Sequence, residues 1–177
     1  MRKPTYLDAI NKKIVREFLF SHFSFTSIIG LAGPDVNHYI SYCKEKGFTD
    51  IEIWEVSPDV MIKQLMDIKH PVNMKFGNIL NAEVKNNVLY DLDYCVTVKF
   101  MKEHIQKFLS NFIMTFSLRV GVDYTINKFF KDRKETIIGV IEKSSPIPYT
   151  IFTTNLGKYI YTQYFDTSAM CCIAKIK

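Results

Sequence analysis

The sequence lacks the features of a membrane or secreted protein. No apolar run approaches the ~20 residues of a membrane-spanning helix, and the residues Met1–Tyr6 lack the apolar core of a signal peptide. Cysteine is scarce, and no Cys-x-x-Cys pair occurs among Cys43, Cys95, Cys171 and Cys172. We therefore expect a reduced, cytoplasmic protein with no disulfide framework and no membrane partner.

Histidine, glycine and proline are also few. The four histidines, His22, His38, His70 and His104, lie far from one another and from the cysteines, so we expect no metal site. The composition is that of a globular protein, 47% hydrophobic and 23% charged. A chain of 177 residues fits a single domain. We expect one domain over 1–177, with an N-terminal helical extension at 1–23 and a core at 24–177.

The formal net charge is +5, which is mildly basic and compatible with a polyanionic partner. The basic residues form local clusters rather than one block, for example Lys12, Lys13 and Arg16 on the expected N-terminal helix. Two interpretations stay open. The clusters are either solvated helix faces or a nucleic-acid surface, in which case Lys12, Lys13 and Arg16 would follow phosphates.

Strand and helix patterns alternate through most of the chain. Short β-rich runs predict strands over 25–29, 51–56, 72–76, 88–95 and 112–118. Apolar residues at helical spacing predict helices over about 5–22, from Pro34 to Gly47, from Pro58 to before Pro71, over 99–109 and over 123–143. The stripe Val36, Tyr39, Ile40 and Cys43 should face inward on the second of these helices. This alternation favours parallel strands joined by right-handed helical crossovers.

The C-terminal part follows a different pattern. Ser144–Pro148 breaks the preceding helix, and two β-rich runs at 158–165 and 170–176 are too close for a helical crossover. They predict an antiparallel hairpin, and 149–157 is either a lead-in loop or a short strand. The predicted fold is therefore α/β: a Rossmann-like, doubly wound, mostly parallel seven-stranded sheet that ends in an antiparallel β-hairpin.

One motif indicates a ligand site. The first predicted strand leads into Gly30-Leu-Ala-Gly33, and the second ends on the acidic residue Glu55. Glycines let a backbone turn tightly and approach a ligand, and a carboxylate can accept hydrogen bonds from two ribose hydroxyls. This order is typical of a domain that holds an adenosine-bearing cofactor at a strand–helix turn. The alternative is a purely structural turn.

The arrangement resembles the class I S-adenosylmethionine (SAM)-dependent methyltransferases over about residues 25–177. The glycine loop resembles the family's cofactor loop, Glu55 its ribose-binding acid, and Asn78 takes the place of the acid near the adenine amino group. The resemblance implies SAM as cofactor, bound by Gly30, Ala32, Gly33, Glu55 and Asn78.

The family's methyl-transfer motif corresponds to Asp91-Leu-Asp-Tyr-Cys95, and the resemblance implies catalytic roles for Asp91, Asp93 and Tyr94. Asp91 and Asp93 alternate on one face of a strand. Because two unpaired buried carboxylates are costly, we expect both to face the cofactor crevice and to bind or deprotonate the nucleophile's amino group. Alternatively, Asp91 contacts backbone or the methionine amino group, and Asp93 caps the next loop. Tyr94 either stacks on the target or packs.

The sequence thus predicts an enzyme, a SAM-dependent methyltransferase acting on a nucleic-acid base or a related amino-group acceptor. The alternative is a catalytically inactive methyltransferase-like binding or assembly module, which the incomplete glycine loop and the replacement of an acid by Asn78 favour. The compact, Lys/Ile/Asn/Phe-rich composition hints that such a module would be of viral origin. The expected partners are RNA or DNA, a second copy of the chain, or a protein that presents the target.

Overall fold

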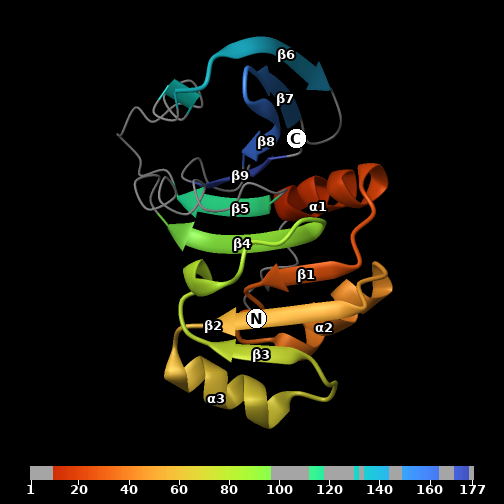
Figure 1. Ribbon diagram of the computed structural model, residues 1–177, viewed down its shortest axis with the longest axis vertical. Helices are drawn as coiled ribbons and strands as arrows, with labels where there is room; N and C mark the ends of the chain where they lie inside the picture. The colour runs from red at the N-terminus through yellow and green to blue at the C-terminus, as the bar shows by residue number, and fades with distance from the viewer. Residues whose placement is uncertain are drawn as a thin grey trace.

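The computed structural model describes residues 10–96, 112–117, 130–131, 134–143, 149–163 and 170–175, with side chains over 15–21, 23–92, 130–131, 134–140 and 150–161. The described strands form one sheet in the order β3-β2-β1-β4-β5-β9-β8-β7-β6 (Figure 1). The strands are β1 (Ser27–Gly30), β2 (Asp50–Glu55), β3 (Asn73–Phe76), β4 (Val88–Val96), β5 (Phe112–Ser117), β6 (Ile137–Lys143), β7 (Tyr149–Thr154), β8 (Gly157–Gln163) and β9 (Met170–Lys175). The helices are α1 (Ile10–His22), α2 (Val36–Glu45), α3 (Pro58–Asp67) and the 3-10 turn η2 (Ile79–Asn81).

Half of the sheet is parallel, as the alternation of strands and helices predicts. β1 pairs in parallel with β2 and β4, β2 with β3, and β4 with β5. The predicted C-terminal hairpin is also confirmed: β8 and β9 pair antiparallel, and β9 lies between β5 and β8. The parallel half brings the carboxyl ends of β1, β2, β3 and β4 to one rim of the sheet, where ligands bind in open α/β sheets.

Two of the sequence predictions fail at the other end of the sheet. The sheet has nine strands rather than seven, because β6 and β7 form an additional antiparallel hairpin next to β8. The helix predicted over 123–143 is wrong from Ile137 onward, where β6 runs. The spacing of Ile137, Val140 and Ile141 fits a helix and a strand equally well. Lys134 has a left-handed backbone conformation (φ 58°), which turns the chain before β6 begins. The predicted helix at 99–109 and residues 118–129 lie outside the described residues.

The helix α2 folds as its sequence predicts. Its buried residues are Val36, Tyr39, Ile40 and Cys43, and the Asp35 carboxylate accepts a hydrogen bond from the His38 backbone N–H at the helix start. These side chains join a core that includes Val15 and Leu19 of α1 and the inward residues of β1 and β2. The helix α1 also packs against β5, β8 and β9 (Figure 1).

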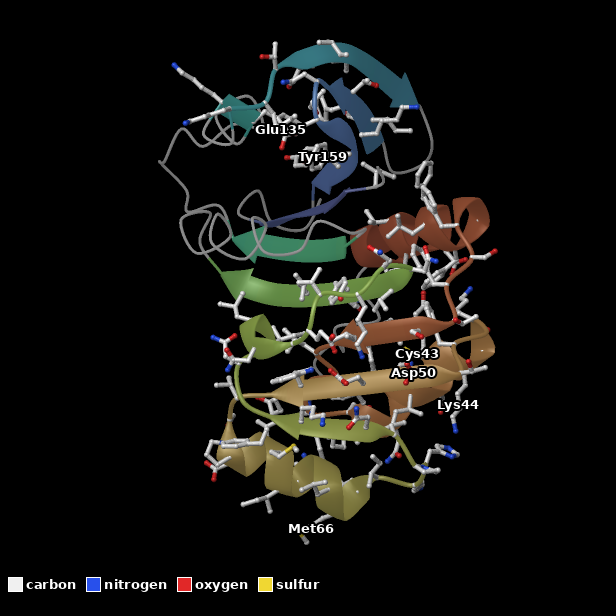
Figure 2. All side chains as sticks on the ribbon, viewed as in Figure 1. Cys43, Lys44, Asp50, Met66, Glu135 and Tyr159 are labelled. Atoms are coloured by element: carbon white, nitrogen blue, oxygen red, sulfur yellow. The ribbon has the colours of Figure 1, made fainter. Side chains whose placement is uncertain are left out.

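The helix α3 buries a different face from the one that its apolar residues suggest. Met61 and Gln64 are its buried residues, whereas Ile62, Leu65 and Met66 are exposed. Figure 2 shows Met66 at the outer edge of the molecule, beyond β3. Among the described helices, none is both long and apolar enough to cross a membrane.

Candidate functional site

The carboxyl ends of β1, β2 and β3 meet at one rim of the sheet. In the parallel register, Gly30 lies opposite Ile53, and Glu55 lies opposite Phe76. The loops that follow these strands carry Gly33 and Asn78, and the Gly77 backbone N–H donates to the Glu55 carbonyl at 2.8 Å. The structure therefore brings four of the predicted cofactor-binding positions, Gly30, Gly33, Glu55 and Asn78, to neighbouring strand ends and the loops that follow them.

Gly33 is the open point of the glycine loop. Its φ of +63° lies in the left-handed region, and a Cβ atom there would meet nothing within 4 Å. Its carbonyl oxygen accepts a hydrogen bond from the side-chain amide of Gln64, a fully buried residue of α3. The sequence analysis missed Gln64, and its signal is a polar residue on the helix face that also carries Met61. At Gly33 the loop therefore exposes its backbone without a side chain, and the hydrogen bond from Gln64 of α3 fixes the position of the loop.

Gly30 and Ala32 contact the core instead. A Cβ atom on Gly30 would overlap the Tyr39 hydroxyl oxygen and lie 3.2 Å from Asp91 Cβ. The Ala32 side chain is buried and belongs to the core cluster. The two residues therefore shape the loop through packing, and of the loop positions Gly30, Ala32 and Gly33, Gly33 is the one with open space beside it.

Asp91 lies in the core in a charged network. Arg16 Nη2 donates to both carboxylate oxygens of Asp91 at 2.9 Å, and the Tyr39 hydroxyl donates to Oδ2 at 3.2 Å. Arg16 and Asp91 are 2% and 1% exposed. Asp91 therefore does not face an open crevice as expected, because α1 supplies a counter-charge that satisfies it within the core.

This network corrects the expectation for Arg16. Arg16 was expected at the surface with Lys12 and Lys13, but its buried guanidinium makes an ion pair and cannot follow phosphates. The side chains of Lys12 and Lys13 lie outside the described ones. The Asp91 backbone also holds the glycine loop, because its carbonyl accepts from the Leu31 N–H at 3.3 Å. The network therefore ties α1, α2 and β4 to the base of the loop.

The other predicted catalytic residues follow directly along β4. Asp93 and Tyr94 belong to the strand, but their side chains lie outside the described ones, so their roles remain predictions. The same holds for Cys95. Asp93 and Tyr94 both follow Leu92, where the pairing of β4 with β5 shifts register before Val96.

Glu55 and Asn78 have polar atoms directed to the rim loops. One carboxylate oxygen of Glu55, Oε1, accepts from the backbone N–H groups of Val56 and Ser57 at 2.9 and 2.8 Å. Asn78 Oδ1 accepts from the Leu80 N–H at 3.0 Å and starts η2. Within the described part of the chain, neither Glu55 Oε2 nor Asn78 Nδ2 has a hydrogen-bond partner. Both atoms are therefore available to a ligand, and Asn78 has used one of the two lone pairs of its carbonyl oxygen.

Burial determines the protonation of the groups behind the loop. Loss of hydration, with a smaller contribution from the nearby Asp91 carboxylate, raises the pKa of the Cys43 thiol from 9.0 to about 12, and Arg16 opposes the shift. Burial likewise raises the pKa of Tyr42. Cys43 is thus a protonated core residue (Figure 2) and not a nucleophile. In the residues that the structure describes, no cluster of three or more His, Cys, Asp or Glu side chains could hold a metal.

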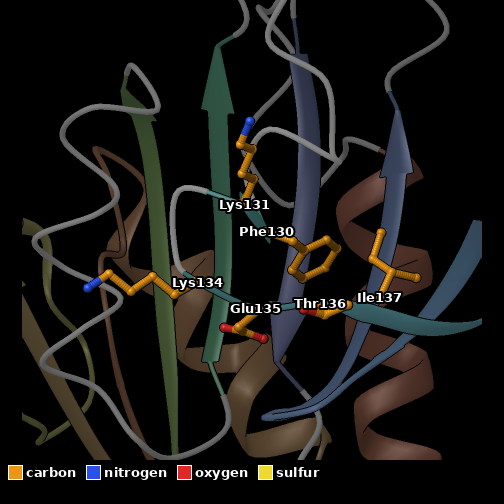
Figure 3. Close-up of a pocket in the computed structure, with 6 residues that line it drawn as sticks. All are labelled: Phe130, Lys131, Lys134, Glu135, Thr136 and Ile137. Carbon is orange, nitrogen blue, oxygen red and sulfur yellow. The ribbon is translucent and has the colours of Figure 1, made fainter.

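A separate cavity of about 370 Å³ lies at the start of β6, the last strand in the sheet order. Its lining, shown in Figure 3, is Phe130, Lys131, Lys134, Glu135, Thr136 and Ile137. The Glu135 carboxylate is buried and accepts hydrogen bonds from the Tyr159 and Thr154 hydroxyls at 2.7 and 2.8 Å. None of the residues predicted for cofactor binding or catalysis lines this cavity, so we place the candidate site at the rim formed by β1, β2 and β3.

Comparison with known proteins agrees with this architecture. No family model matches the chain, and no curated protein sequence matches it. Solved structures do match. TYW2 of M. jannaschii, in complex with AdoMet, has a TM-score of 0.53 and 11% identity over 93% of this chain and 74% of its own. PH1948 of Pyrococcus horikoshii, a candidate RNA methyltransferase, has a TM-score of 0.53 and 12% identity over 98% of this chain and 85% of its own.

The strand order and these matches together decide the fold. The chain has the fold of the class I SAM-dependent methyltransferases. In this class I fold, β9 is the antiparallel strand between the parallel half and β8, and the β6–β7 hairpin extends the sheet beyond it. The class I fold also occurs in a protein described as a pericyclic reaction enzyme, with a TM-score of 0.54 and 8% identity over all of this chain and 50% of its own. The fold therefore does not fix the reaction.

Proposed function

We propose that the chain is a SAM-dependent methyltransferase that acts on a nucleic-acid base or a related amino-group acceptor. One observation carries the proposal: the unbonded carboxylate oxygen of Glu55 lies at the end of β2, on the same rim as the open, left-handed Gly33. A carboxylate beside bare backbone at this rim suits a ribose and the adjoining part of an adenosine cofactor.

The residues at the rim fit SAM. Glu55 Oε2 would accept hydrogen bonds from the ribose hydroxyls, while Oε1 keeps the β2–α3 turn in place. Gly33 would let the backbone approach the ligand, and Asn78 would contact the adenine amino group through its carbonyl oxygen. When bound, SAM supplies an electrophilic methyl group on a sulfonium, so the protein mainly has to orient the acceptor.

Asp93 and Tyr94 are the residues that we propose to orient the acceptor. Asp93 would accept a hydrogen bond from the acceptor amino group or take its proton, and Tyr94 would stack on a flat base. Asp91, which carries an ion pair with Arg16, acts as a positioning residue for the glycine loop and β4. A nucleic-acid acceptor is supported by the net charge of +5 and by the likeness to PH1948, a candidate RNA methyltransferase.

The second candidate is a methyltransferase-like module that binds SAM or a nucleic acid without catalysis. The engagement of Asp91 in a core ion pair favours it, because one of the two carboxylates expected at the acceptor is absent from the rim. The incomplete glycine loop supports it as well.

Calorimetry with SAM and with S-adenosylhomocysteine tests the cofactor first. We expect saturable heat with both ligands, and no heat with either would refute the proposal. Transfer of a labelled methyl group from SAM to total RNA, to DNA and to small amines then separates the two candidates. Label in RNA or DNA that is lost in Asp93→Asn, with SAM affinity unchanged, supports the enzyme. SAM binding with no label in any acceptor supports the inactive module.

A further inference from the structure

The helix α3 connects the two elements that carry the proposed cofactor contacts. It begins at Pro58, directly after the turn that Glu55 holds through its Oε1 atom. Further along the helix, Gln64 Nε2 donates a hydrogen bond to the Gly33 carbonyl oxygen at 2.5 Å, although the two residues are 31 positions apart in the sequence. One helix therefore joins the carboxylate at the end of β2 to the open glycine in the loop after β1.

Apolar packing does little to fix the position of α3. Its buried residues are Met61 and Gln64, at 8% and 0% exposure, whereas Ile62, Leu65 and Met66 are exposed. A helix that buries so little apolar surface gains little hydrophobic stabilisation from its docking. The polar contacts of α3 therefore decide where the helix lies relative to the glycine loop.

Two side-chain amides make these polar contacts. Asn37, in the first turn of α2, donates from Nδ2 to the Asp67 carbonyl at 2.6 Å, and its Oδ1 accepts from the Lys69 N–H at 3.0 Å. Asn37 thus holds the C-terminal end of α3 against α2. The second amide is that of Gln64, and it is the one that acts on the glycine loop itself.

The other amide atom of Gln64 indicates a role beyond packing. Gln64 Oε1 is buried and has no hydrogen-bond partner among the described residues. A buried acceptor without a donor costs free energy that an apolar side chain of similar size would not incur. The hydrogen bond to Gly33 accounts for glutamine at this position, because it draws the Gly33 carbonyl toward α3 and leaves open space beside the left-handed Cα atom.

We propose that Gln64 is a positioning residue for the cofactor: its hydrogen bond to Gly33 fixes the glycine loop at the separation from Glu55 that SAM requires. The inference rests on the proposed function, since it concerns the same site. Because Gln64 is fully buried, it acts through the loop backbone. Without the hydrogen bond, the permissive backbone of Gly33 would let the loop adopt other conformations. The affinity for SAM would then fall with the fraction of molecules whose loop is ready to bind.

The first test compares two variants of α3. Gln64→Met removes the amide and keeps a side chain of similar length, and calorimetry should show a dissociation constant for SAM about tenfold higher. The matched control, Met61→Ala, weakens the packing of the same helix and keeps the amide, so its dissociation constant should stay within about twofold of the wild type. Urea denaturation gives the stability of both. Wild-type affinity in Gln64→Met would overturn the role, as would equal losses of affinity in the two variants.

Hydrogen exchange in the protein without ligand separates this inference from the proposed function. The Leu31 N–H donates to the Asp91 carbonyl at the base of the loop and should exchange about threefold faster or more in Gln64→Met. The Phe48 N–H, which donates to the Cys43 carbonyl beyond the other end of α2, should not change.

The combined outcomes are distinct. A wild type that binds neither SAM nor S-adenosylhomocysteine overturns the proposed function, and with it the cofactor role of Gln64, even if Leu31 responds. A wild type that binds SAM, with the same Leu31 exchange in Gln64→Met, overturns the positioning role alone. Faster exchange at both Leu31 and Phe48 would indicate general destabilisation and would also overturn that role.

Gln64→Glu provides a test that a packing role would not pass. A protonated carboxyl group at position 64 can donate to the Gly33 carbonyl as the amide does, whereas an ionised one can only accept. Since burial favours the protonated form, the variant should bind SAM almost as tightly as the wild type at about pH 5 and about tenfold more weakly at about pH 8. The wild type, measured at the same pH values, corrects for Glu55 and other groups. A ratio of the two dissociation constants that does not change with pH would contradict the donor role of Gln64.

Discussion

Arg16 and Asp91 form an ion pair across 75 residues of sequence, with the Arg16 Nη2 atom 2.9 Å from each carboxylate oxygen. The pair connects α1 to β4 in the core, where Asp91 lies opposite Gly30 in the pairing of β4 with β1. The Tyr39 hydroxyl also donates a hydrogen bond to Asp91. The glycine loop of the proposed cofactor site is therefore supported by charge as well as by packing.

The buried pair should be strongly coupled. Asp91→Leu or Arg16→Met alone should lower the free energy of unfolding by about 3–5 kcal/mol, because each leaves the other group buried without its partner. The double variant Arg16→Met/Asp91→Leu should cost much less than the sum. Urea denaturation of the four proteins measures the coupling, and additive losses would contradict it.

The partly exposed pair of Lys46 and Glu17, with Nζ and Oε1 2.6 Å apart, provides the control for this experiment. Lys46→Met should change the free energy of unfolding by less than about 1 kcal/mol, because solvent screens a surface ion pair.

Gly30 and Gly33 should respond to alanine for different reasons. Gly30→Ala should destabilise the fold by about 1–3 kcal/mol, because the new methyl group meets Tyr39 and Asp91. Tyr39→Phe removes the obstructing hydroxyl oxygen and should reduce that cost. At Gly33 a new methyl group has free space, so Gly33→Ala should lower the free energy of unfolding only through the strain of a left-handed alanine, by about 1–2 kcal/mol. Thermal unfolding of the variants measures these effects, and a Gly30→Ala cost that is the same with and without the Tyr39 hydroxyl would show that the contact is unimportant.

Glu55→Gln should weaken SAM binding by about 1.5–3 kcal/mol, because the carboxylate oxygen proposed to bind the ribose becomes an amide nitrogen. The substitution keeps a carbonyl oxygen for the Val56 and Ser57 N–H groups, so the β2–α3 turn should persist. Calorimetry measures the affinity and circular dichroism the fold. Wild-type affinity in the variant would exclude this role for Glu55.

The raised pKa of Cys43 predicts a loss of stability in alkaline solution. In the unfolded chain the thiol loses its proton near its ordinary value of 9.0, whereas in the folded chain it keeps the proton to about 12. The unfolded state therefore binds fewer protons between these values, and the free energy of unfolding falls by about 1.4 kcal/mol per pH unit as the pH rises. Urea denaturation at successive pH values above and below 9 should show a shallower slope in Cys43→Ala; equal slopes would disprove the assignment.

The sequence predicts the parallel half of the fold well, because the signals there are local. The runs around Ile28, Ile51 and Leu89 are short and bounded by turns, and the α2 stripe has one clear apolar side. The strand β6 is less predictable, since Ile137, Val140 and Ile141 suit either period and their pairing with β7 decides the outcome. On α3 the apolar residues outnumber the buried positions, so composition alone cannot show which side faces inward.

In the candidate site, too, the positions set by local motifs could be predicted, whereas the contacts between distant elements could not. The positions of Gly33 and Glu55 follow from motif and spacing, and the structure brings them to one rim of the sheet. The burial of Asp91 depends on Arg16, a residue of another element 75 positions away, and no local pattern pairs the two. The contact of Gln64 with Gly33 is likewise a tertiary one between α3 and the glycine loop.

The contacts of α1 affect how the chain must be assembled during synthesis. Val15 and Leu19 lie in the core, and the helix packs on β5, β8 and β9, which are made long after it. The earlier elements α2, β1 and β4 already contact α1, but the part of the helix that packs on β5, β8 and β9 stays uncovered until those strands leave the ribosome, and it remains available to chaperones or to other nascent chains. Stalling of translation before residue 157, where β8 begins, should therefore leave a species that aggregates readily.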